Sequence, residues 1–177
     1  SLMVYNSGTA STMFAASGTA VYNVTSAGSV GSAVITSLTN ARFQSVNMTT
    51  SGGSFLFICN GADAPRHWNG SAWATPTLGS VTAANIINVE VYKERLFFVL
   101  KDSLTYGYLP VNAVAGTVAS VNLGSVFSKG GKIMAIATWT RDGGAGPDDN
   151  ILFFTDQGEI AMYSGTDPSD ATKWGLV

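Results

Sequence analysis

The fold of this chain is decided by a short stretch, Leu96-Phe97-Phe98-Val99-Leu100-Lys101-Asp102. Its apolar run is typical of a buried strand, and Asp is a residue that favours turns. Similar apolar stretches that end in a Gly or Asp turn occupy Thr12–Gly18, Phe55–Gly61 and Leu152–Gly158. The sequence therefore predicts one structural unit that is repeated four times.

One phenylalanine marks each unit: Phe14, Phe57, Phe98 and Phe154, which are 43, 41 and 56 residues apart. A second strand with an aromatic side chain is expected soon after each unit, and these aromatic residues are Tyr22, Trp68, Tyr106 and Tyr163. Periods of roughly 40–50 residues with several strands each are typical of propeller blades. We expect the four phenylalanines to be buried at equivalent positions of their blades.

Further strands are expected on both sides of each unit. The strands before the units are Leu2–Tyr5, Phe43–Met48, Val89–Tyr92 and Ile133–Trp139. The strands that close the blades are expected at Ser32–Ile35, Ser71–Ala74, Ala119–Leu123 and Trp174–Val177. The larger gap before the fourth unit is interpreted as an insertion in one loop, Thr140 to Asn150. A single helical turn, capped by Asp167, is expected before the last strand.

These patterns predict an all-β fold, a β-propeller-like array of about four antiparallel blades in a single domain. The expected blades are residues 1–40, 41–84, 85–130 and 131–177. The chain opens and stops on expected strands, and most propellers have more than four blades. We therefore expect a fragment of a longer protein and part of a larger propeller.

Composition restricts the classes of partner. Only 11% of the residues are charged, against roughly 25% in an average soluble chain. Such a surface suits a protein that is largely covered by partners. The net charge is −2 and the basic residues are scattered, so the basic stripe of a nucleic-acid surface is missing. No apolar run reaches the roughly 20 residues of a membrane span, and no signal-peptide pattern is seen.

Few residues qualify for catalysis. His67 is the only histidine, which excludes a multi-histidine metal site, and its place beside Trp68 favours a packing role over that of a general base. Cys59 is the only cysteine and lies in an apolar strand, where a buried structural thiol is the simpler interpretation than a reactive one.

The acidic residues gather in the fourth unit. Asp142, Asp148 and Asp149 lie in the Arg141–Asn150 segment, which has the composition of a calcium loop but lacks its ligand spacing. We expect a mobile or partner-bound loop without a tight metal site, and a weak cation site remains the alternative. Asp156 and Glu159 flank a turn, where solvent exposure explains them without chemistry.

The aromatic side chains could form sugar platforms, but at one or two per blade they are better explained as packing between blades. This set is Tyr22, Trp68, Trp73, Tyr106, Tyr108, Trp139, Tyr163 and Trp174.

Several segments resemble a known family. They are Asn60–Pro65 with Trp68-Asn69-Gly70, Tyr92–Phe98, Leu109–Asn112, Thr138–Thr140 and Tyr163–Pro168. In these segments the chain is similar to the tail hub or nozzle β-propellers of short-tailed phages, which stabilise the head–tail connection. The resemblance implies a structural component of a phage or prophage tail that is located in the virion and acts by contacts with other tail or portal subunits or with itself. It implies no enzymatic activity, and the residues themselves offer no motif for a cofactor or a metal.

A carbohydrate-binding or glycan-processing β-propeller is the alternative function. It predicts at least two carboxylates that converge in a cavity beside exposed rings. The tail interpretation predicts extensive contact surfaces instead.

Overall fold

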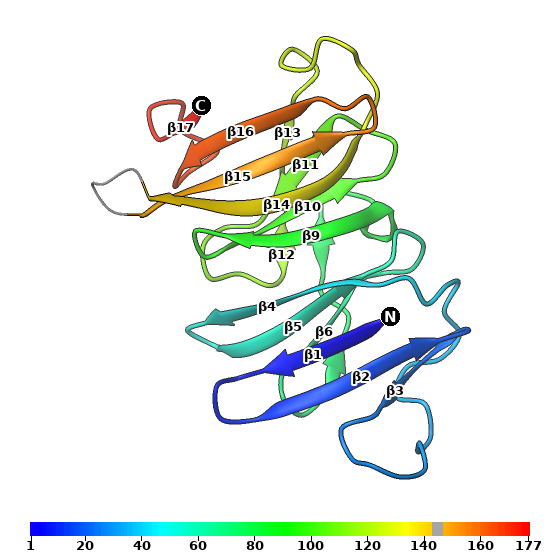
Figure 1. Ribbon diagram of the computed structural model, residues 1–177. Helices are drawn as coiled ribbons and strands as arrows, with labels where there is room; N and C mark the ends of the chain where they lie inside the picture. The colour runs from blue at the N-terminus through cyan, green and yellow to red at the C-terminus, as the bar shows by residue number, and fades with distance from the viewer. Residues whose placement is uncertain (143–146) are drawn as a thin grey trace.

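In the computed structural model, which describes residues 1–142 and 147–177, the chain folds into four antiparallel sheets that follow one another along the sequence (Figure 1). The fold class is all-β, as predicted, and no α-helix occurs among the described residues. The described part therefore also contains no helix long and apolar enough to cross a membrane.

Each sheet is a meander whose strands pair in the order of the sequence, with one short strand of another sheet intervening in the third. The first contains β1 (Leu2–Asn6), β2 (Ser11–Ser17) and β3 (Ala20–Asn23). The second contains β4 (Gln44–Thr50), β5 (Gly53–Cys59), β6 (Arg66–Trp68) and β7 (Trp73–Ala74). The third contains β9 (Ile86–Tyr92), β10 (Arg95–Leu100), β11 (Thr105–Tyr108) and β13 (Ala119–Asn122). The fourth contains β14 (Ile133–Asp142), β15 (Pro147–Thr155), β16 (Ile160–Gly165) and β17 (Trp174–Leu176).

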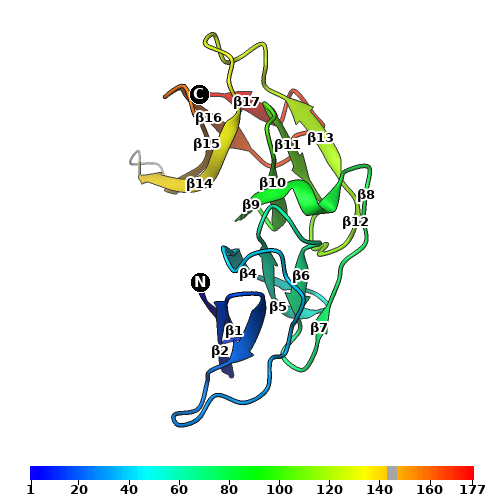
Figure 2. The ribbon, with the colours of Figure 1, turned by 90° about the vertical axis from the view of Figure 1, so that its right-hand side faces the viewer.

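A small parallel pair, β8 (Leu78–Gly79) with β12 (Gly116–Thr117), and a 3-10 turn, η1 (Ala83–Asn85), lie beside the third sheet. The sheets stack face to face along an arc, and the first strand of each sheet lies on the concave side (Figure 2). Within the described residues, no sheet closes on itself.

Hydrophobic side chains fill the three spaces between consecutive sheets. Between the first two sheets, the ring of Phe14 packs edge-on against Trp68 and Trp73, with centroid distances of 5.2 and 4.9 Å. Between the third and fourth sheets, Tyr106 stacks on Phe153 at 4.5 Å. Most aromatic residues of the repeats therefore belong to the core, as predicted. Trp139, which is 50% exposed, and Tyr22 are exceptions, because they lie on the outer faces of the fourth and first sheets and not between sheets.

We call the face of a sheet that points toward the next sheet along the chain its leading face, and the opposite face its trailing face. The buried leading-face residues are Phe14 and Ala16 in β2, Phe57 and Cys59 in β5, and Phe97 and Val99 in β10. The trailing faces contribute Leu56 and Ile58 in β5, Leu96 and Phe98 in β10, and Ile151 and Phe153 in β15.

The predicted common register of the four phenylalanines is wrong at Phe98. Phe57 and Phe98 meet across one interface at 5.6 Å, so they lie on opposite faces of their sheets, and Phe97 is the equivalent of Phe14 and Phe57. Strand β10 is buried on both faces, and such a strand is apolar at every position, so its sequence cannot reveal the register. Phe154 lies on the expected face but is only half-buried, because no sheet covers that side of the fourth sheet.

Two smaller expectations need correction. Ser32–Ile35 forms no strand and contributes only a bridge from Ile35 to Val21, because its sheet ends at β3. The helical turn at Asp167 is a plain turn, in which the Asp167 carboxylate accepts the Ser169 N–H.

The segment 140–150 is not one loop. Thr140 pairs with Asp149 and Asp142 with Pro147, so both strands of the β14–β15 hairpin continue into it. The rest of the expected loop, residues 143–146, lies outside the described residues. The predicted mobility of the loop therefore stays a prediction.

Candidate functional site

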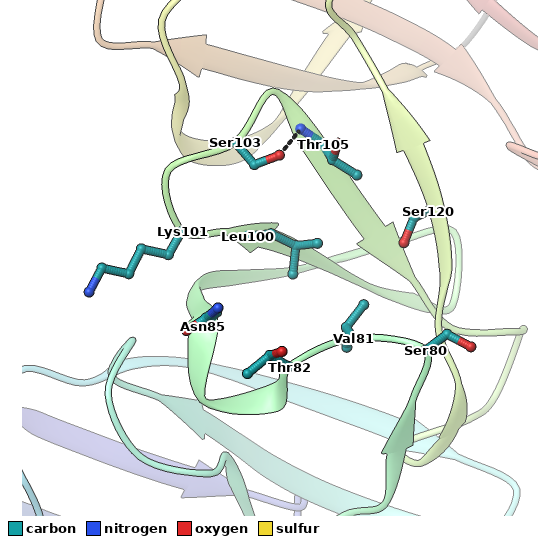
Figure 3. A pocket seen from close by; sticks show the side chains of 9 residues that line it. All are labelled: Ser80, Val81, Thr82, Asn85, Leu100, Lys101, Ser103, Thr105 and Ser120. Atoms are coloured by element: carbon teal, nitrogen blue, oxygen red, sulfur yellow. Dashed lines mark hydrogen bonds between the residues drawn. The ribbon is translucent and has the colours of Figure 1, made fainter.

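A shallow pocket of about 330 Å³ lies at the end of β10 in the third sheet (Figure 3). Its lining is rich in hydroxyl groups and consists of Ser80, Val81, Thr82, Asn85, Leu100, Lys101, Ser103, Thr105 and Ser120. Two backbone bonds hold its wall: the Lys101 N–H donates to the Asn85 carbonyl at 2.8 Å, and the Asn85 N–H donates to the Thr82 carbonyl at 2.8 Å.

The chemistry of this pocket is limited to hydrogen bonding. None of its lining residues is a carboxylate, a histidine or a cysteine, so it holds no pair of groups for acid–base catalysis. Its one charged side chain, Lys101, extends away from the hydroxyl groups (Figure 3). The Ser103 hydroxyl accepts the Thr105 N–H at 2.9 Å. The pocket was not predicted from the sequence, because residues rich in serine and threonine are equally typical of ordinary surface loops and of loops that line a cavity.

Glu159 and Asp156, the two carboxylates considered for catalysis, both hold the loop that leads into β14. Glu159 accepts the Ser128 N–H at 3.0 Å, the Ser128 hydroxyl at 2.8 Å and the Lys129 N–H at 2.9 Å. Asp156 accepts the Lys132 N–H at 2.9 Å. The bonds from Lys129 and Ser128 lower the pKa of Glu159, so it is charged at neutral pH and is a poor proton donor.

Asp149 belongs to a polar junction between the third and fourth sheets. Its carboxylate accepts hydrogen bonds from the Lys93 ammonium at 2.7 Å and the Thr140 hydroxyl at 2.8 Å, which lower its pKa. The Tyr92 hydroxyl donates to the Asp149 carbonyl at 2.7 Å. Arg95 extends the same junction, because its guanidinium lies 3.5 Å from the Asp167 carboxylate. These contacts join the two sheets.

His67 and Cys59 occupy packed positions. The His67 ring meets Phe55 edge-on at 5.3 Å, and partial burial lowers its pKa. Its Nδ1 atom is buried and has no hydrogen-bond partner among the described residues, so no carboxylate orients the ring through that nitrogen. Cys59 is completely buried, and this burial raises its pKa to about 12. A thiol with that pKa is not a nucleophile at neutral pH.

No cluster of three or more His, Cys, Asp or Glu side chains that could hold a metal occurs within residues 1–142 and 147–177. The expected absence of a tight metal in the acidic segment stays a prediction, because residues 143–146 are not described.

Comparisons with protein-family models, with curated protein sequences and with solved structures find no match to this chain.

Proposed function

We propose that this chain is a structural component of a phage or prophage tail, and that it acts by contacts between subunits and catalyses no reaction. The observation that carries the proposal is a pair of uncovered apolar sheet faces at the two ends of the stack, on β1–β3 and on β14–β16. Large exposed apolar surfaces on a folded protein mark sites of association. The resemblance of several sequence segments to tail hub propellers is the reason for proposing a phage tail.

The arrangement of the sheets supports a propeller-like assembly. The meanders are stacked face to face, with their first strands side by side on the concave side of the arc (Figure 2). Propeller blades are four-stranded meanders around a central axis, and three of the four sheets have four strands while the first has three. We propose that the four sheets are blades.

The use of the polar residues supports the absence of catalysis. Glu159 and Asp156 anchor a loop, Asp149 joins two sheets, and His67 and Cys59 lie in packed positions. General acid–base catalysis needs a group with a matched pKa beside an open site. None of these five residues lines the pocket.

A panel of glycoside substrates tests the proposed lack of catalysis. We expect no turnover by the chain. Turnover that is abolished by Asp156→Asn or Glu159→Gln, and retained in Glu94→Gln, would replace the structural role with that of a glycosidase. Gene neighbourhood tests the tail assignment: adjacent portal and tail genes would support it, and sugar-utilisation genes would contradict it.

The hydroxyl-rich pocket favours one alternative, a site for a small polar ligand such as a glycan. It lacks the aromatic platform that sugar sites use, which weighs against this alternative. A glycan array decides between the two. Binding that is lost in Ser120→Trp, which would fill the pocket, but kept in Ser26→Trp, on an exposed loop, would establish the alternative.

A further inference from the structure

The leading face of the fourth sheet is apolar and has no neighbour among the described residues. Ile136, Ile151, Phe153 and Ala161 point toward the third sheet, so the alternate residues of these strands point away from it. The apolar residues that point away are Ala135, Ala137, Trp139, Leu152, Phe154, Ile160 and Met162; the polar residues Asn150 and Ser164 lie on the same face, and Asn150 is buried. None of the apolar residues is buried; Trp139 is 50% exposed and Ile160 is 60% exposed. We call this set the fourth-sheet leading face.

The opposite end of the stack has the same character. Met3, Tyr5, Phe14 and Ala16 point toward the second sheet, so the alternate residues point away. They are Leu2, Val4, Met13, Ala15 and Tyr22, which pair across the three strands. Leu2 is 73% exposed and Met13 is 41% exposed. We call this set the first-sheet trailing face.

The internal interfaces indicate what covers these two faces. In all three, the leading face of one sheet packs against the trailing face of the next. Phe154 occupies the position of Phe14, Phe57 and Phe97, each of which is fully buried against the following sheet. The fourth-sheet leading face is therefore half of the same repeated interface. The half that is missing is a trailing face, and this chain presents an uncovered one on its first sheet.

We propose that copies of this chain associate head to tail, with the fourth-sheet leading face of one copy against the first-sheet trailing face of another. The proposal rests on the contact function proposed above and names its partner as a second copy of this chain. Both faces consist of uncharged side chains, so their contact leaves no buried charge unpaired. Such an interface joins two different surfaces, so it closes into a ring or continues as a chain of copies.

Sedimentation velocity tests the proposal with one charged substitution on each face. Ile160→Lys blocks the fourth-sheet leading face, and Met13→Lys blocks the first-sheet trailing face. Both side chains are exposed, so each variant is expected to fold, which urea unfolding checks. Val111→Lys, on an exposed turn outside both faces, is the matched control. At about 100 μM, where an interface with a Kd of about 10 μM is populated, the unsubstituted chain and the control should sediment as oligomers.

The mixture of the two variants gives the decisive result. Each variant alone should be monomeric, because it keeps only one of the two complementary faces. An equal mixture should form a complex of two copies through the two faces that remain intact. A monomeric unsubstituted chain, or a mixture that stays monomeric, overturns the proposal. Dimers of Met13→Lys alone would show pairing of identical leading faces and would also overturn it.

This outcome is separate from the test of the proposed function. A monomeric chain without glycosidase activity removes only the head-to-tail contact, whereas glycoside turnover removes the contact function itself.

Discussion

The covered and uncovered faces of the sheets differ in burial but not in chemical character. Phe97, on a covered leading face, is fully buried, whereas Phe154, at the equivalent position of the last sheet, is half-buried. Both phenylalanines lie in strands that contain the sequence Leu-Phe-Phe. The residue types of this repeat therefore indicate which sheet faces are apolar. Only the presence of an adjacent sheet decides whether such a face is buried in the core.

The largest expected effect compares these two phenylalanines. Phe97→Ala should lower the free energy of unfolding by about 3–5 kcal/mol, because it leaves a cavity between two sheets. Phe154→Ala should cost less than about 2 kcal/mol, because its ring already contacts water. Urea unfolding at a concentration where the chain is monomeric measures both. Equal losses would mean that the two faces do not differ in coverage.

A pair of glycines sharpens the comparison. A Cβ atom at Gly107 would lie 2.6 Å from Val118 Cγ1 and 3.7 Å from Phe98 Cδ2, within a covered interface. Gly107→Ala should therefore cost about 1–3 kcal/mol through overpacking. Gly175, in β17, has open space where its Cβ would be, so Gly175→Ala should change stability by less than about 0.5 kcal/mol. Thermal unfolding distinguishes them, and a neutral Gly107→Ala would contradict the close packing.

A smaller, pH-dependent effect tests whether polar anchors also support a covered interface. Hydrogen bonds from Lys129 and Ser128 hold the pKa of Glu159 below its usual value of 4.5. The stability that this carboxylate contributes is therefore complete above about pH 4.5 and is lost as the pH falls through its lowered pKa in the folded state.

Glu159→Gln should reduce stability at pH 7 and flatten the decline below pH 4.5, as measured by urea midpoints across the pH range. Glu94→Gln, on an exposed turn, is the charge-matched control. An unchanged pH profile in Glu159→Gln would remove the anchoring role.

The smallest effect concerns the turn between β9 and β10, which precedes the doubly covered strand. Lys93 and Glu94 have positive φ values of 47° and 59°. Because such angles strain residues other than glycine, Glu94→Gly should stabilise the chain by roughly 0.5–1 kcal/mol. Glu94→Ala removes the same side chain and keeps the strain, so it should give no gain. A gain in both variants would trace the effect to the side chain, not to the backbone.

The sequence alone determined the four repeats, the all-β class and most strands, because alternation and turn residues are local signals. The strands expected at Val89–Tyr92 and Ala119–Leu123 were predicted in this way. The aromatic core also followed from local spacing, since large rings recurred in every unit.

Tertiary structure decided which face of a strand meets which neighbour. Phe97 and Phe98 are identical residues side by side, and only the sheets on either side of β10 assign one to each interface. Glu159 anchors residues about 30 positions away, such as Lys129, and the pocket is likewise lined by segments that are distant in sequence. No local sequence pattern predicts either feature. The uncovered faces could not be predicted from the sequence either. Whether an apolar strand is buried depends on a neighbouring sheet that packs against it, and not on the residues of the strand itself.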